Sequence, residues 1–202
     1  MGQNYLKIRN DYLQQAWARS PAVLSACLPA EPSAAGLRFQ AFGAECLLTA
    51  EEITLAGAAA TGPEGLLIAL YASSVPDLPV DLNSLRSFKE LPHSMPYQGA
   101  FAANAEQILV PRVTAIHQHQ ERLAAAFSGY INHDPVSGDF SFTLYPLPRV
   151  PLYYIFHLPD EEFPASVTCL FAANAPVFMP LDGLADVAEY TGKKISSLLA
   201  EK

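Results

Sequence analysis

Two uncharged apolar runs on either side of a short acidic turn constrain the fold of this chain more than any other feature. Residues 152–158 (LYYIFHL) follow three closely spaced prolines, and residues 167–171 (VTCLF) form the second run. Between the runs lies Asp160-Glu161-Glu162, followed by Phe163-Pro164. Because short apolar runs bounded by turn residues are typical of buried strands, this stretch predicts two neighbouring strands joined by an acidic turn.

Amphipathic periodicity predicts helices before, between and after the strands. The predicted helices cover residues 3–19, 21–28, 63–73, about 101–110, about 111–127 and 182–200. Pro63 suits the first position of its helix, where the N–H would be unpaired anyway. Pro111 is expected to break the two central helices apart, and Asp182 is expected to be the N-cap of the last helix.

Further strands are predicted at 37–55, which fits two or three short ones, and at 129–133 and 139–145, which flank the turn sequence DPVSG. In residues 139–145, apolar residues alternate with Ser141 and Thr143, so one face of this strand is expected to be wet. The remaining segments are a linker at 30–36 and an irregular, proline-rich segment at 74–99.

Short links between the later strands indicate an antiparallel sheet, since parallel pairs need long crossovers. The sequence therefore predicts an α+β fold, in which an antiparallel C-terminal meander at about 129–171 packs with N-terminal, central and C-terminal helices. With 202 residues, half of them hydrophobic, the chain is expected to form a single domain over 1–202. Residues 1–34 would be a helical N-terminal extension and residues 35–202 the core.

Charge and cysteine content exclude several partners. The chain has 12 basic and 20 acidic residues and a net charge of −8, so we expect no nucleic-acid partner and no membrane partner. No apolar run is long enough for a spanning helix, and the N-terminal residues lack the apolar core of a signal peptide. Cys27, Cys46 and Cys169 are few, odd in number and far apart, which favours a reducing, cytoplasmic setting.

Common catalytic and cofactor motifs are absent from the sequence. There is no glycine-rich nucleotide loop, no G-x-S-x-G, no H-E-x-x-H and no C-x-x-C. His117 and His119 are two apart on a predicted helix, so their imidazoles would point in nearly opposite directions. We therefore expect no metal and no cofactor, although a catalytic group assembled from distant residues would leave no local motif.

Four short motifs occur in a specific order: FKELP at 88–92, LPRVP at 147–151, DEEFP at 160–164, and Leu170-Phe171. Over about residues 35–200 the chain resembles an uncharacterised bacterial and archaeal family, domain-of-unknown-function family 3786. That family has no established activity. Its members occur largely in anaerobes and some carry an iron–sulfur-binding segment, which implies a setting in anaerobic redox or cofactor metabolism. This chain lacks a cysteine-rich segment and has Ala172 where an aspartate is expected, which weakens a metal-linked role.

The acidic turn and its neighbours are the candidate site. In a functional interpretation, one carboxylate is a general base, His157 is its partner, and a guanidinium orients a substrate anion. The catalytic candidates are His157, Glu161 and Glu162, and the ligand-binding candidates are Arg149, Tyr153 and Asp160. The same residues fit a structural interpretation, with solvated or capping carboxylates, Arg149 as their ion-pair partner and His157 in the core.

Three hypotheses about function follow, and they leave open whether the chain is an enzyme. The first is a non-catalytic accessory module that presents residues 146–171 to a small molecule or a protein partner, with Tyr145, Tyr153 and Tyr154 in a pocket wall and Arg149 as anion anchor. The second is a hydrolase- or lyase-type enzyme that uses a carboxylate–histidine pair in residues 157–162. The third is a structural or homo-oligomer-forming protein, in which the first helix and residues 74–99 would supply an interface.

Overall fold

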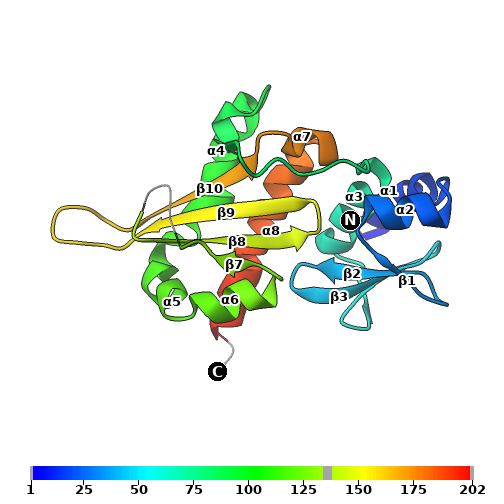
Figure 1. The fold of residues 1–202 in the computed structure, drawn as a ribbon, viewed down its shortest axis with the longest axis horizontal. Coiled ribbons are helices and arrows are strands. Elements are labelled where there is room, and N and C mark those ends of the chain that lie inside the picture. The colour runs from blue at the N-terminus through cyan, green and yellow to red at the C-terminus, as the bar shows by residue number, and fades with distance from the viewer. Residues whose placement is uncertain (1, 134–137, 201–202) are drawn as a thin grey trace.

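The computed structural model describes residues 2–133 and 138–200 of the chain. Two antiparallel five-stranded sheets lie side by side, each with its own helices (Figure 1). We call residues 2–75 the N-terminal lobe and residues 84–200 the C-terminal lobe. Buried side chains of both lobes belong to one hydrophobic cluster. The α+β fold class expected from the sequence is confirmed.

The N-terminal lobe consists of three helices and the smaller sheet, whose strand order is β1-β2-β3-β4-β5. Its elements are α1 (Gly2–Trp17), α2 (Pro21–Cys27), β1 (Glu31–Pro32), β2 (Leu37–Ala41), β3 (Ala44–Leu48), β4 (Ile53–Leu55), β5 (Ala58–Ala59) and α3 (Pro63–Ser74). Helix α3 begins at Pro63, as predicted. The segment at 30–36 is more than a linker, because it contains β1, which pairs with β2. A strand this short has too little periodicity to be recognised in a sequence.

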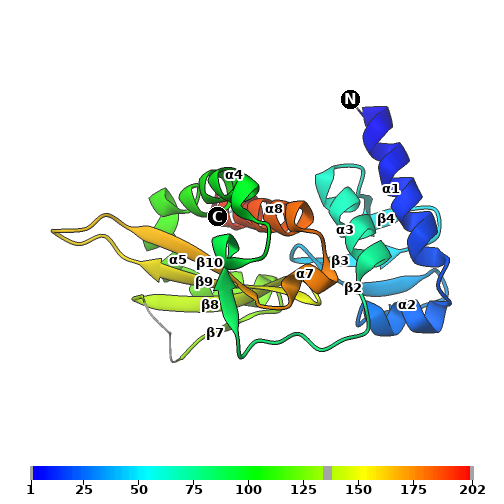
Figure 2. The same cartoon turned by 90° about the horizontal axis from the view of Figure 1, so that it is seen from above.

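The larger sheet of the C-terminal lobe has the order β6-β10-β9-β8-β7. Its strands are β6 (Leu85–Ser87), β7 (Tyr130–Ile131), β8 (Phe140–Leu147), β9 (Val150–His157) and β10 (Ser166–Ala172). The helices of this lobe are η1 (Phe88–Glu90), η2 (Met95–Tyr97), α4 (Gln98–Phe101), the π-helical η3 (Ala102–Gln107), η4 (Val110–Arg112), α5 (Val113–Gln118), α6 (Gln120–Ala126), α7 (Ala175–Phe178) and α8 (Leu181–Ala200). Helices α4 and α8 lie on the same side of the sheet (Figure 2).

The predicted meander is confirmed as β7–β10, and β9 is buried from Val150 to Phe156. Pro111 lies in a 3-10 turn between helices, as expected. The predicted turn DPVSG falls almost wholly on residues 134–137, outside the described residues. Helix α8 begins at Leu181, so Asp182 lies inside the first turn and is not the N-cap.

The expected wet face of β8 is polar but buried. Ser141 and Thr143 are each only 1% exposed. The Asn132 side chain donates to the Ser141 hydroxyl at 3.2 Å and accepts from the Thr143 hydroxyl at 3.1 Å. Alternation of polar and apolar residues therefore predicted correctly which face of β8 is polar. It did not predict that a neighbouring segment would bury this face and form hydrogen bonds with its hydroxyl groups.

Candidate functional site

The turn between β8 and β9 brings Arg149 to the junction of the two lobes. The two strands pair regularly up to Leu144↔Leu152, and their register then shifts before Leu147↔Val150. Such a bulge bends the strand. Beside it, the Pro146 carbonyl accepts the N–H of Phe42 from the N-terminal lobe at 2.7 Å.

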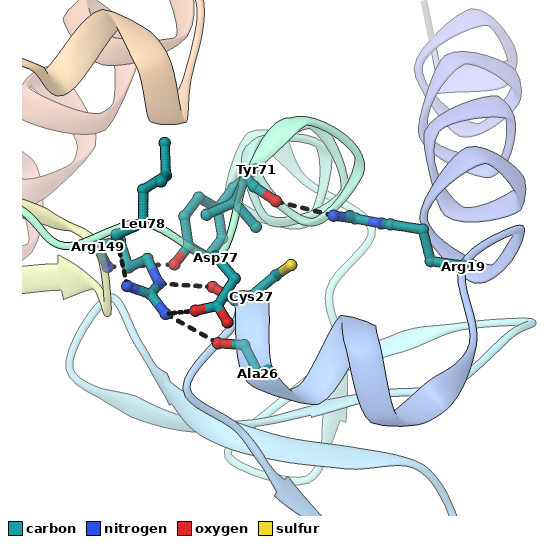
Figure 3. Close-up of polar contacts among 8 residues, drawn as sticks. Arg19, Ala26, Cys27, Tyr71, Asp77, Leu78 and Arg149 are labelled. Carbon is teal, nitrogen blue, oxygen red and sulfur yellow. Dashed lines mark hydrogen bonds and ion pairs between the residues drawn. The ribbon is translucent and has the colours of Figure 1, made fainter.

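The Arg149 guanidinium binds acceptors from two segments of the chain (Figure 3). Its Nε donates to the Cys27 carbonyl at 2.8 Å, and Nη2 donates to the Ala26 carbonyl at 2.9 Å. Nη2 also pairs with the Asp77 carboxylate at 2.7 Å, and Nη1 donates to the Leu78 carbonyl. We call Arg149 with these four acceptors the arginine clasp. Because these acceptors take four of the five guanidinium N–H groups, little remains for binding a ligand anion.

The clasp places a positive charge at the C-terminal end of α2, where helix carbonyls lack partners. Arg19 serves the end of α3 in the same way, donating from Nη1 to the Val75 carbonyl at 2.8 Å and from Nη2 to the Ala72 carbonyl. The buried Tyr71 hydroxyl accepts the backbone N–H of Arg149 at 3.1 Å, and burial raises the pKa of Tyr71. In this geometry Arg149 links the two lobes.

The acidic turn lies at the opposite end of β9 from Arg149. Along an extended strand, the distance from Val150 to His157 is roughly 23 Å. Residues 158–165, which we call the acidic finger, project beyond the sheet (Figures 1 and 2). The structure therefore does not bring Arg149 together with Asp160 or Glu162, and the ion-pair partner of Arg149 is Asp77.

Backbone N–H groups within the finger bind the Asp160 carboxylate. Its Oδ1 accepts the N–H of Phe163 at 2.7 Å and the N–H of Glu162 at 2.8 Å. The Asp160 N–H in turn donates to the Phe163 carbonyl at 3.0 Å. The bonds from Phe163 and then Glu162 lower the pKa of Asp160. This carboxylate therefore shapes its own turn.

His157, Glu161 and Glu162 are exposed. His157 is the last residue of β9, where it faces Ser166 of β10, so it is not the core residue of the structural interpretation. In the described part of the chain, no hydrogen bond joins its imidazole to either glutamate. The structure thus does not form the carboxylate–histidine pair that the enzyme hypothesis needs.

Of the three tyrosines expected in a pocket wall, Tyr145 borders a cavity, whereas Tyr153 and Tyr154 are buried in the sheet. The Tyr153 hydroxyl lies 3.2 Å from the Ser141 hydroxyl. The Tyr154 hydroxyl has no hydrogen-bond partner among the described residues, and burial raises the pKa of this side chain.

A partly buried carboxylate that the sequence did not single out lies near Tyr154. Glu106, in η3, accepts the N–H of Cys169 in β10 at 2.9 Å. Strand β6 ends at Ser87, opposite Leu170, so this N–H lies just beyond the reach of the edge strand. Burial is the main cause of the raised pKa of Glu106. One glutamate in an alanine-rich helix gives no sequence signal of such a contact.

Two adjacent open cavities form a groove that begins at the junction of the lobes and continues onto the N-terminal lobe. A cavity of about 320 Å³ is lined by Pro29, Gln40, Ser128, Tyr145 and Pro148. A second cavity of about 380 Å³ shares two of these residues, and its lining is Pro29, Glu31, Arg38, Phe39, Gln40 and Glu45. We call the two together the tyrosine groove.

Within residues 2–133 and 138–200, no group of three or more His, Cys, Asp or Glu side chains is placed to hold a metal ion. Over the same residues, none of the helices combines the length and the apolar character needed to cross a bilayer.

These features define an α+β protein of two antiparallel sheets, joined by an arginine clasp and extended by an acidic finger. A family model described as a domain of unknown function (DUF3786) matches residues 20–194, and the chain belongs to this family. The resemblance inferred from the four motifs is thereby confirmed, and the matched region includes α2, the helix whose end the clasp binds. No curated protein and no solved structure matches the chain.

Proposed function

We propose that this protein is a non-catalytic accessory module that presents the acidic finger to a protein partner. The observation that carries the proposal is Phe163, whose side chain is 66% exposed in the finger. Aromatic side chains are enriched in interface cores and often account for much of the binding energy. An exposed ring on a projecting turn fits a residue that enters a pocket of another protein.

The finger is ordered by its own hydrogen bonds, which supports a binding role. Asp160 holds the turn through the N–H groups of Glu162 and Phe163. At the base of the finger, the Leu158 N–H donates to Asp139 Oδ2 at 2.7 Å. A turn that is ordered before binding loses less conformational entropy in the complex, so more of the contact energy becomes affinity.

The charge of the finger indicates the chemistry of the partner. Glu161 and Glu162 precede Phe163 and are exposed, and the whole chain carries a net charge of −8. Opposite charges across an interface speed association and exclude wrong partners. We therefore infer an apolar pocket with a basic rim on the partner.

We place this module in the cytoplasm, in the anaerobic redox or cofactor metabolism that the family resemblance implies. The three cysteines are free and buried, which suits a reducing compartment. The proposal gives no catalytic role to His157 or to the exposed glutamates, because no hydrogen bond joins them among the described residues.

Affinity capture followed by calorimetry tests this function. The partner captured by the wild-type protein is identified by mass spectrometry, purified and titrated with each variant. Phe163→Ser should raise its Kd at least about tenfold, since loss of a hot-spot side chain costs about 1.4 kcal/mol or more. Val177→Ser is the matched control, because Val177 is an apolar side chain that is 51% exposed elsewhere, in α7.

Charge reversal provides a second readout. The double variant Glu161→Lys, Glu162→Lys should weaken binding strongly at low salt and less at high salt, because salt screens exposed charges. A captured partner that binds the wild type and Phe163→Ser with equal affinity would show that the finger is not the interface.

A further inference from the structure

We propose that the tyrosine groove binds an extended, proline-containing peptide of a partner protein, with a basic residue at one end of the peptide. This site is separate from the acidic finger. The groove lies at the lobe junction beside the β8–β9 turn, whereas the finger lies at the other end of β9 (Figure 1).

The apolar lining of the groove suits proline rings. Pro29, Pro148 and Tyr145 present flat surfaces within one cavity. The half-exposed Tyr130 ring stands beside them, with its centroid 6.4 Å from that of Tyr145. Proline-rich peptides form polyproline II helices, which dock their rings against aromatic side chains in shallow grooves.

The polar groups of the groove suit an extended backbone. A polyproline II helix makes no internal hydrogen bonds, so its carbonyls are free to accept from a binding surface. Gln40 and Ser128 are exposed at the groove, and the Tyr145 hydroxyl belongs to the same lining. Like any tyrosine hydroxyl, that of Tyr145 is protonated at neutral pH and can donate; burial raises its pKa further, to about 12.

The shape of the groove favours a chain over a compact ligand. The two cavities share Pro29 and Gln40, so the site is elongated and open to solvent along its length. Enclosed pockets bury most of a small ligand, whereas this groove leaves one side of its occupant uncovered.

The charge at one end of the groove indicates which end of the peptide is basic and whether the peptide comes from this protein or another. Glu31, Glu45 and Arg38 line this end, and Arg38 pairs with Glu45 at 3.3 Å. The remaining negative charge attracts a basic residue. It also repels the acidic finger of a second copy, although that finger contains Pro159 and Pro164. The occupant is therefore a segment of a different protein.

Selection from a random dodecapeptide phage library on the immobilised full-length protein tests the inference. We expect the enriched peptides to contain prolines with Arg or Lys to one side. Their synthetic, fluorescein-labelled forms are then titrated by fluorescence polarisation. Tyr145→Ala should weaken binding at least tenfold. Gln40→Lys, at an exposed strand position, should do the same without affecting the core.

Two further variants sharpen the test. Glu31→Lys should weaken the basic peptides and strengthen versions in which Glu replaces the basic residue. Phe163→Ser should bind the peptides like the wild type. The experiment therefore tests peptide binding by the groove independently of the proposal that the finger is an interface. The inference is overturned if no peptide is enriched, if enriched peptides lack proline, or if they bind Tyr145→Ala and Gln40→Lys as tightly as the wild type.

Discussion

At the scale of residues, Arg149, Asp160 and Glu106 each bind backbone groups that no helix or strand partner satisfies, at the end of α2, inside the acidic turn, and on β10 beyond the end of β6. Arg149 binds the last carbonyls of α2, Asp160 binds two N–H groups of its turn, and Glu106 binds an N–H of β10. A cluster of charged residues in a sequence does not reveal whether the side chains bind backbone groups or a substrate. The roles of Arg149 and Glu106 depend on segments far away in the chain, whereas Asp160 acts within its own turn.

Removal of the clasp tests the role of Arg149 as a link between lobes. Arg149→Met keeps the aliphatic length and should lower the free energy of unfolding by about 1–3 kcal/mol, because the carbonyls of Ala26, Cys27 and Leu78 lose their charged donor. Asp77→Ala should cost less than about 1 kcal/mol, since the Asp77 side chain is 64% exposed and its ion pair is screened. Urea unfolding measures both. If the two variants lose the same small amount of stability, the carbonyl contacts of Arg149 contribute nothing to the fold.

The pH dependence of stability tests the burial of Glu106. Its pKa is raised in the folded state, so its contribution to stability is full below the unfolded-state pKa and is lost as pH rises through the folded-state pKa. Glu106→Gln keeps an acceptor for the Cys169 N–H without ionising. This variant should gain stability over the wild type at about pH 8, and the gain should shrink towards about pH 4. A stability difference that does not change with pH, in urea unfolding at several pH values, would contradict this.

At the scale of elements, long or strongly patterned segments were predictable and short ones were not. β9, β10, α3 and α8 follow from apolar runs and helical spacing. β1 and β6 exist only because a neighbouring strand pairs with them, so no local pattern marks them. The separation of Arg149 from the acidic turn, by contrast, was implicit in the sequence. An eight-residue strand between them puts them at opposite ends of a sheet.

A glycine at the start of the larger sheet tests how closely its elements pack. A Cβ on Gly129 would lie 2.1 Å from the Thr143 carbonyl oxygen of β8. Gly129→Ala should therefore cost about 2–3 kcal/mol, because backbone must move to relieve the overlap. Gly99→Ala in α4 is the control, since its Cβ would meet nothing within 4 Å, and it should be neutral or stabilising by up to about 1 kcal/mol. Thermal unfolding compares them, and an unchanged Tm for Gly129→Ala would refute the close approach.

At the scale of the whole molecule, the strands at 37–55 were predictable from the sequence. That they form a sheet separate from that of the later strands was not. How the strands are arranged depends on contacts between residues distant in sequence. Examples are the hydrogen bond from Phe42 to Pro146 and that from Arg149 to Ala26. These contacts, together with the shared hydrophobic cluster, make the two lobes depend on each other.

Thiol reactivity tests whether the lobes unfold together, as a single domain should. Cys46 lies in β3 and Cys169 in β10, both are buried, and burial raises the pKa of Cys46 to about 12 and that of Cys169 as well. In the wild type, both thiols should react with an aromatic disulfide reagent at one common rate, that of global unfolding. Arg149→Met should separate the two rates. Different rates in the wild type, followed by mass spectrometry, would show that the lobes open independently.

The bend between Leu144 and Leu147 limits how the length of the chain can change among relatives. Because side chains along a strand alternate between faces, deleting one residue before Val150 would turn Arg149 away from α2. Inserting residues into the acidic finger would leave the pairs between β9 and β10 in place. Gaps in an alignment of homologues should therefore collect in the acidic finger, between β9 and β10, and avoid the turn between β8 and β9.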